Sequence, residues 1–191
     1  MGRQIKNAVL VFVTLSVLTG VIYPFFITGI AKLFFNQKAE GSLIYRDGKL
    51  IGSSLIGQPF DDPKYFWGRP SATFPVTYNA ASSSGSNLSQ SNPALFEAVK
   101  VRLKALKDAD PNNKNPVPVD LVTSSASGLD PHISLAAAYY QIPRIARFRG
   151  LPEETVRAMI IKYSSGRLFG VIGEPVVNVF VLNLALDGNK K

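Results

Sequence analysis

The sequence contains no cysteine and only one histidine among its 191 residues. Without cysteine, the chain cannot form a disulfide, a thiol nucleophile, a cysteine-ligated zinc or iron–sulfur centre, or a lipoprotein anchored through cysteine. A single histidine also excludes a metal site that needs several imidazole ligands. We therefore expect no metal site and no cofactor of the chain's own.

The sequence also lacks the motifs of common catalytic and nucleotide sites. It has no GxxxxGK[ST] loop, no GxGxxG fingerprint and no GxSxG elbow. The Asp-Lys-Thr-Gly-Thr loop that is phosphorylated in P-type ATPases is absent too. His132, with Ser125 or Ser127 as nucleophile, could form a hydrolase site, but closeness in sequence is weak evidence for a triad. We therefore predict no catalytic residues.

Charge does not indicate nucleic-acid binding. The chain has 21 Lys and Arg against 13 Asp and Glu, a net charge of +8. The basic residues do not gather with aromatic residues into one stripe, as a nucleic-acid interface requires. Hydrophobic residues make up 46% of the chain, which is enough for a folded core.

One long apolar run decides the class of protein. Between Lys6 and Lys32 lie 25 residues without a charged side chain. A helix of that length spans about 37 Å, more than the roughly 30 Å of a bilayer's hydrocarbon core. Residues 1–35 are thus predicted to be a membrane anchor with a single transmembrane helix at about 7–34. A cleaved signal peptide remains an alternative, although its apolar core would be shorter.

Four residues inside this run are predicted to shape its packing in the membrane. Gly20 and Gly29 allow another helix to approach closely, and Tyr23 suits a membrane interface. Pro24 removes one backbone donor and kinks the helix. Membrane helices tolerate such a proline when neighbours pack against it.

The charges that flank the helix predict its orientation only weakly, because they are nearly balanced. Arg3 and Lys6 precede the helix, and Lys32, Lys38 and Arg46 lie at its end or follow it. The short N-terminal flank is easily retained in the cytoplasm. We expect a single-pass protein of the bacterial inner membrane whose soluble domain lies on the outer side.

Residues 36–191 predict one soluble domain, so the fold class is α+β. Asp47-Gly48 between short apolar runs predicts a hairpin, and Tyr65-Phe66-Trp67 reads as core. Residues 68–93 are rich in Ser, Gly and Asn, which is typical of a flexible linker or of a functional loop.

Local signals place further elements in this domain. Asn92 and Ser134 are predicted helix caps, Pro143 restarts a helix that Gly150 ends, and Glu153 opens another. Residues 117–123 look extended, and residues 176–184 look like a buried strand. Three arginines are expected to point into solvent from the helix that Gly150 ends: Arg144, Arg147 and Arg149.

A resemblance covers nearly the whole chain. The motifs that carry it are GSSLIGQPF at 52–60, GRPSA at 68–72, PVDLVTSSASGLDPHIS at 118–134, QIPR at 141–144, GEPVVNV at 173–179 and LNLALD at 182–187. In this order, they closely resemble the KdpC family, the C subunits of bacterial potassium-transporting ATPases.

The resemblance implies an accessory, non-catalytic subunit of a high-affinity ATP-driven potassium uptake pump. Its implied partners are a channel-like potassium-translocating subunit, a P-type ATP-hydrolysing subunit, a small membrane subunit and membrane lipid. The family is needed for assembly and is described as a catalytic chaperone that raises the ATP affinity of the hydrolysing subunit. ATP would act through the complex.

For this sequence, the resemblance suggests nucleotide contacts at Ser127, Gly128 and Gln141. The stretch from 124 to 141 could also hold phosphate through backbone amides at a helix start. A domain outside the membrane could not reach cytoplasmic ATP, so these two expectations conflict. A membrane-anchored nucleotide-binding module, or a sensor or scaffold, remains the alternative.

Overall fold

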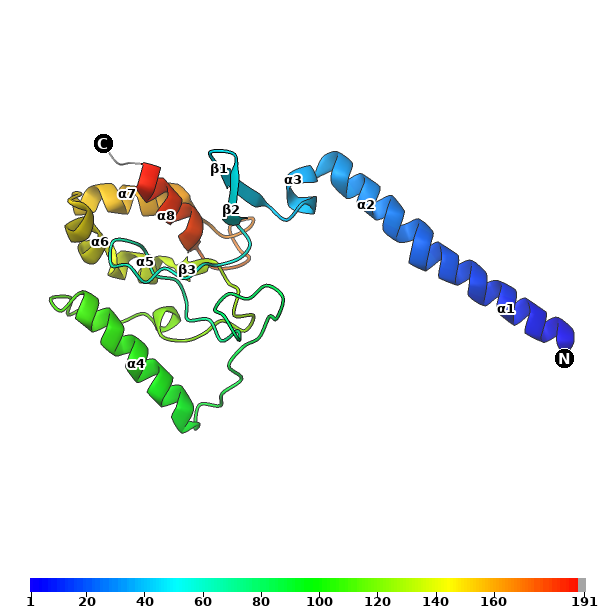
Figure 1. Ribbon diagram of the computed structural model, residues 1–191, viewed down its shortest axis with the longest axis horizontal. Helices are drawn as coiled ribbons and strands as arrows, with labels where there is room; N and C mark the ends of the chain where they lie inside the picture. The colour runs from blue at the N-terminus through cyan, green and yellow to red at the C-terminus, as the bar shows by residue number, and fades with distance from the viewer. Residues whose placement is uncertain (189–191) are drawn as a thin grey trace. The chain divides into compact units, whose positions relative to one another are not determined.

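The computed structural model describes residues 1–188, and its contacts divide the chain into two compact units, Met1–Ser53 and Ser54–Lys191. The first unit begins with a continuous helical stretch, Gly2–Phe34, drawn in blue in Figure 1. Among the described residues, it is the one helix long and apolar enough to cross a membrane. The predicted single N-terminal membrane helix is therefore confirmed as a structural element.

This spanning helix has three parts. They are α1 (Gly2–Val17), a π-helical turn η1 (Leu18–Ile22) and α2 (Tyr23–Phe34). No residue of the three is buried. A mostly apolar surface that is exposed along the helix is suited to lipid or to a partner.

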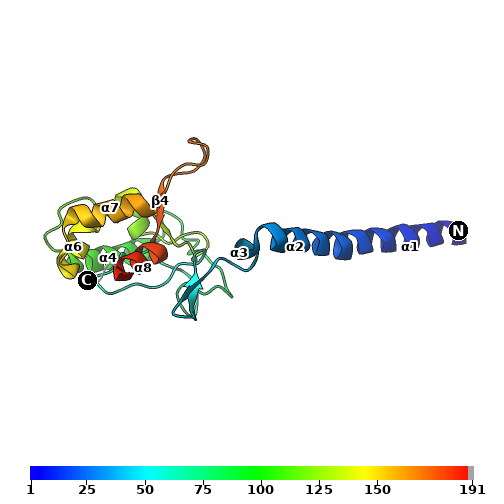
Figure 2. The same ribbon diagram turned by 90° about the horizontal axis from the view of Figure 1, so that it is seen from above.

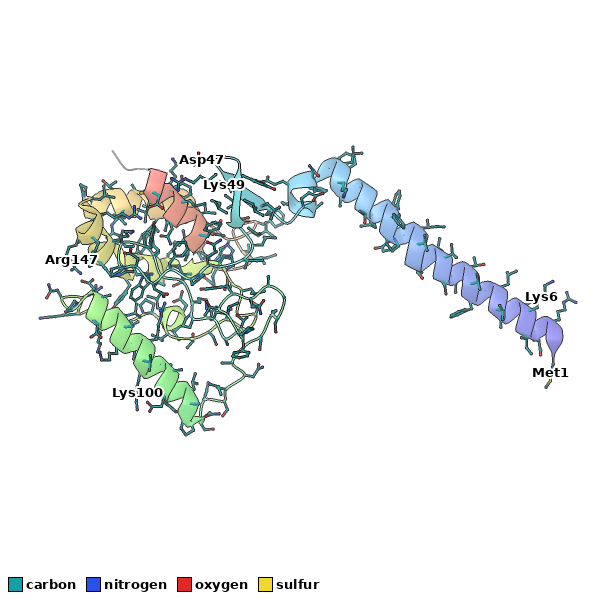
Figure 3. The ribbon with its side chains drawn as sticks, viewed as in Figure 1. Met1, Lys6, Asp47, Lys49, Lys100 and Arg147 are labelled. Carbon is teal, nitrogen blue, oxygen red and sulfur yellow. The ribbon has the colours of Figure 1, made fainter. Side chains whose placement is uncertain are left out.

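A short helix and a hairpin complete the first unit. After α3 (Asn36–Ala39), β1 (Leu43–Arg46) pairs antiparallel with β2 (Lys49–Ser53). Asp47 and Gly48 adopt φ of 51° and 75°, as a type I′ turn requires, so the predicted hairpin is confirmed. Asp47 and Lys49 mark its tip in Figure 3. The predicted boundary between a 1–35 anchor and a 36–191 domain remains a prediction.

The second unit is a mixed α and β domain, as predicted. Its elements are α4 (Pro93–Ala109), the 3₁₀ turn η2 (Val119–Leu121), β3 (His132–Ser134), α5 (Leu135–Tyr140), α6 (Ile142–Arg149), α7 (Glu153–Tyr163), β4 (Ser164–Ser165), β5 (Val176–Asn178) and α8 (Val179–Gly188). The strands form one small antiparallel sheet in the order β3-β5-β4. Figure 2 shows the loop between β4 and β5 projecting away from the helices.

The helix ends follow the predicted capping signals. The Asn92 side chain accepts a hydrogen bond from Ala94 N at 2.9 Å, and Ser134 Oγ accepts one from Ala137 N at 3.1 Å. Gly150 ends α6 in the left-handed conformation, with φ of 64°. These caps satisfy backbone groups that the helix itself leaves without partners.

The predicted buried strand over 176–184 is wrong beyond its first three residues. Asn178 ends β5, and its Oδ1 accepts a hydrogen bond from Val181 N at 3.1 Å, which caps α8. The buried residues of α8 follow the helical period, namely Val179, Phe180, Leu182, Asn183 and Leu186. The valines in this segment are typical of a strand, so its composition did not indicate the helical period.

The extended segment predicted over 117–123 is also wrong. The chain there makes a 3₁₀ turn in which Leu121 N donates to Pro118 O at 3.1 Å. Asp120 stabilises the turn, because its Oδ2 accepts a hydrogen bond from Ser134 N at 2.7 Å. A long-range side-chain contact thus outweighs the local preference for an extended chain.

One continuous core joins the elements of the second unit. Phe66 is fully buried and Trp67 is 6% exposed, so these two residues of the predicted aromatic segment are core, while Tyr65 is half-buried at its edge. The other fully buried large apolar side chains are Leu106, Leu121, Ile133, Ile142, Ile145, Ile160, Leu182, Leu186, Val156 and Val177.

Candidate functional site

Two polar loops meet around the predicted nucleotide residues Ser127 and Gly128. The first loop runs from 54 to 92 and the second from 122 to 131, and neither contains a helix or strand. Hydrogen bonds from serines of the first loop join it to the second. Ser83 Oγ and Ser84 N both donate to Ser127 O at 3.0 Å, and Ser71 Oγ donates to Gly128 O at 2.7 Å. The segment that reads as a linker is thus tied to the candidate site.

Gly128 is required at its position for two reasons. Its φ is 67°, in the left-handed region that side chains disfavour. A Cβ there would lie 2.5 Å from Ser84 O and 2.7 Å from Thr73 Cγ2. The close approach of the two loops therefore depends on a residue without a side chain.

Ser127 lines an open depression of about 560 Å³. The lining residues are Leu55, Arg69, Ser125, Ala126, Ser127, Leu129 and Asp130. Arg69 supplies the positive charge, but its Nη2 donates to Ser124 O at 3.1 Å and its Nη1 lies 3.4 Å from Asp130 Oδ2. The depression thus combines hydroxyl groups with a cation that protein oxygens already hold.

Asp130 and His132 form a local pair beside this depression. Partial burial raises the pKa of Asp130, but hydrogen bonds from the His132 ring and backbone N–H, with the charges of His132 and Arg69, outweigh it and lower that pKa. His132 Nδ1 lies 3.3 Å from Asp130 Oδ1. Within residues 1–188, no hydrogen bond joins the His132 side chain to Ser125 or Ser127, so the geometry of a triad is not present.

Gln141, the third predicted nucleotide residue, lies in the core and does not line the depression. Its side chain is 1% exposed and makes four hydrogen bonds. Its Oε1 accepts from Trp67 N at 2.8 Å and Arg144 Nη2 at 2.6 Å, while Nε2 donates to Trp67 O and Ala137 O at 3.1 Å. A nucleotide would have to displace these bonds, so the role of Gln141 remains a prediction.

Of the three arginines expected in solvent, Arg144 is buried and Arg149 is half-buried instead. Arg144 donates to Pro63 O and stacks 4.5 Å from the Trp67 ring. Burial lowers the pKa of Arg144 to about 10. Arg149 donates to Lys64 O at 2.8 Å and Asp187 Oδ1 at 2.9 Å. A guanidinium tolerates burial when oxygens and aromatic faces surround it, and periodicity alone gives no sign of that.

Arg147 stays partly exposed and bridges two helices. Its Nη1 lies 2.8 Å from Asp110 Oδ1, and Figure 3 shows it between α6 and the end of α4. On α4, Arg102 donates to Leu121 O and Gly68 O and lies 5.2 Å from the Trp67 ring. Arg102 and Arg147 thus join separate elements of the domain.

The four predicted membrane-packing residues lie on the spanning helix, three of them in or next to its irregular turn and Gly29 further along α2. Gly20 belongs to η1, and Tyr23 and Pro24 open α2. A Cβ at Gly20 or Gly29 would meet nothing within 4 Å. The surface around both glycines is therefore open, and their packing role remains a prediction.

Comparison with known proteins gives one family match that includes residues of both units. The family model described as "K+-transporting ATPase, c chain" matches residues 5–188. The potassium-transporting ATPase KdpC subunit of Dechloromonas aromatica is 60% identical over 191 residues, which are all of both chains. The chain belongs to the KdpC family. The KdpC subunit of Sorangium cellulosum is 56% identical over 98% of this chain and 99% of its own.

Another KdpC subunit, from Methylococcus capsulatus, is 57% identical over 98% of both chains. The family resemblance read from the motifs is thus confirmed. The match includes both the spanning helix and the domain, since it begins at residue 5 and ends at 188.

Proposed function

We propose that this chain is the accessory subunit of an ATP-driven, high-affinity potassium uptake pump in the bacterial inner membrane. The observation that carries the proposal is the KdpC match over residues 5–188, with relatives named as subunits of a potassium-transporting ATPase. An exposed apolar helix and a domain whose buried polar groups serve its own packing support a role in assembly rather than in chemistry.

The proposed partners are a channel-like potassium-translocating subunit, a P-type ATP-hydrolysing subunit, a small membrane subunit and membrane lipid. In the described residues, 1–188, no group of three or more His, Asp or Glu side chains could hold a metal ion. We propose that the chain has no catalytic residues and that ATP chemistry belongs to the hydrolysing partner.

The test of this proposal is recovery of the complex. A tagged chain is purified in mild detergent from cells starved of potassium, next to a tagged, unrelated single-span membrane protein. We expect the tagged chain, but not the unrelated control protein, to bring down an ATPase that carries the Asp-Lys-Thr-Gly-Thr loop, together with a large channel-like protein. A strain without the chain should fail to grow at micromolar potassium. Normal growth of that strain would contradict the proposal.

We further propose that the chain raises the ATP affinity of the hydrolysing subunit while its own domain lies on the outer side. Since that domain could not reach cytoplasmic ATP, the effect would pass through packing of the spanning helix. Direct nucleotide contact at Ser127, Gly128 and Gln141 is the competing proposal. The open depression beside Ser127 favours it, and it needs a cytoplasmic domain.

Single cysteines decide between these placements, because the natural chain has none to interfere. Ser86 is exposed in the 54–92 loop and Arg3 is exposed near the N-terminus. In intact cells, a membrane-impermeant maleimide should label Ser86→Cys and reach Arg3→Cys only after lysis. The reverse pattern would place the domain in the cytoplasm and favour direct contact with nucleotide.

A further inference from the structure

The spanning helix has a backbone irregularity near its middle. In η1, the N–H of Tyr23 donates to Leu18 O, five residues back, where an α-helix would use the carbonyl four residues back. The next residue, Pro24, has no N–H to donate. The carbonyl of Thr19 therefore loses the donors both four and five residues ahead of it.

The side chain of Thr19 does not replace these donors. Its hydroxyl donates to Leu15 O at 2.8 Å, toward the N-terminus and away from its own carbonyl. Thr14, the preceding threonine in the span, donates in the same direction, to Leu10 O. Both hydroxyls are therefore engaged elsewhere along the helix.

Thr19 also lies at the depth where an unpaired carbonyl is most costly. It is 13 residues from Lys6 and 13 residues from Lys32, the charged residues that bound the apolar run. At 1.5 Å per residue, each is about 20 Å away, which places Thr19 near the centre of the hydrocarbon. Lipid tails offer no donor there, and water is excluded, so an unsatisfied carbonyl costs several kcal/mol.

The surface next to this carbonyl is accessible to another helix. Gly20 follows Thr19, and a Cβ added to it would meet nothing within 4 Å. No residue of η1 is buried. Small residues let helix backbones approach closely enough for interhelical hydrogen bonds.

We propose that the Thr19 carbonyl is a docking point, which accepts a hydrogen bond from a hydroxyl, amide or indole side chain on a helix of a neighbouring membrane subunit. The inference rests on the proposed function, because it needs a partner in the membrane. Beyond that function, the inference names the atom that the partner contacts, the Thr19 carbonyl oxygen, and the kind of donor that contacts it.

The sequence offers an internal control for testing this. Thr19–Gly20 and Thr28–Gly29 are the two Thr-Gly peptide bonds in the chain. Labelling threonine with ¹³C at the carbonyl and glycine with ¹⁵N therefore gives two correlated signals in solid-state NMR. Thr28 lies inside α2, where the N–H four residues ahead supplies a regular donor.

The full chain is reconstituted in lipid alone and, separately, in the complete complex. We expect the Thr19 carbonyl carbon to resonate upfield of Thr28 in lipid and to move downfield on assembly, while Thr28 does not move. A complex in which the Thr19 signal is unchanged would overturn the inference and leave the proposed function intact. A Thr19 signal already at the hydrogen-bonded position in lipid would overturn it too. Failure to isolate any complex would contradict both the inference and the proposed function.

A second variant tests the inference through assembly. Pro24→Ala restores an N–H and allows a regular helix, so the Thr19 carbonyl regains a partner in its own chain. We expect several-fold less complex in mild detergent, with no change for Ile27→Ala, which adds no N–H to the same helix. Undiminished recovery of the Pro24→Ala complex would show that no partner depends on this carbonyl.

Discussion

Replacing Gln141 with methionine is expected to destabilise the second unit by about 4 kcal/mol, a large part of the stability of a small domain. Methionine nearly keeps the volume but removes four hydrogen bonds. It leaves the buried N–H and C=O of Trp67 and the guanidinium of Arg144 without their partner. Each unsatisfied buried group costs about 1–3 kcal/mol.

Asn183→Leu provides a graded comparison. Asn183 is equally buried and pairs with the N–H and C=O of Phe66 alone, at 2.9 and 3.0 Å. We expect about half the loss of Gln141→Met, because half as many bonds are removed. Urea unfolding of the full chain in detergent, followed by circular dichroism, measures both. Gln90→Met replaces an exposed amide and should leave the free energy of unfolding unchanged. An equal loss of stability from all three variants would show that the removed hydrogen bonds are not its cause.

Gly128→Ala is the second substitution with a large expected effect. The new Cβ would press on Ser84 O and Thr73 Cγ2, and φ of 67° is unfavourable for alanine. We expect a loss of about 3 kcal/mol, from backbone strain and from separation of the two loops. The loop over 54–92 should then become more sensitive to proteases.

Gly170→Ala separates the two causes. Gly170 has φ of 75°, close to that of Gly128, but a Cβ there would meet nothing within 4 Å. The loss of stability from Gly170→Ala should therefore be limited to the cost of a left-handed backbone for alanine, about 1–2 kcal/mol. Thermal unfolding of both variants measures the difference. Equal losses would show that contact with Ser84 does not hold the loops together.

Local signals in the sequence predicted the parts of the fold that depend on neighbours in the chain. Asn92, Ser134 and Gly150 satisfy or end the helix beside them, and Asp47-Gly48 sets a turn by its own dihedral angles. Such residues act within a few positions, so their effect does not depend on the rest of the fold.

Features that depend on distant partners could not be predicted in this way. Arg144 reads as a solvent-facing residue because its acceptors come from Pro63 and Gln141, and the first lies 81 positions away. Residues 176–184 have strand composition, and Asn178 changes the outcome by capping a helix. For the candidate site, the resemblance suggested Ser127, Gly128 and Gln141, and their nucleotide role stays a prediction. The motif gave no sign that Gln141 bonds in the core to Trp67, which lies 74 positions away.

The amide contacts of the core have a consequence for the order of events during synthesis. Asn183, on α8, bonds the backbone of Phe66 across 117 positions, so α8 follows the segment that it contacts by most of the second unit. The core therefore cannot close until α8 has been made, whereas the spanning helix is made long before it. An unfolded chain behind a membrane helix is the form that a translocation channel accepts, which agrees with the proposed outer placement of the domain.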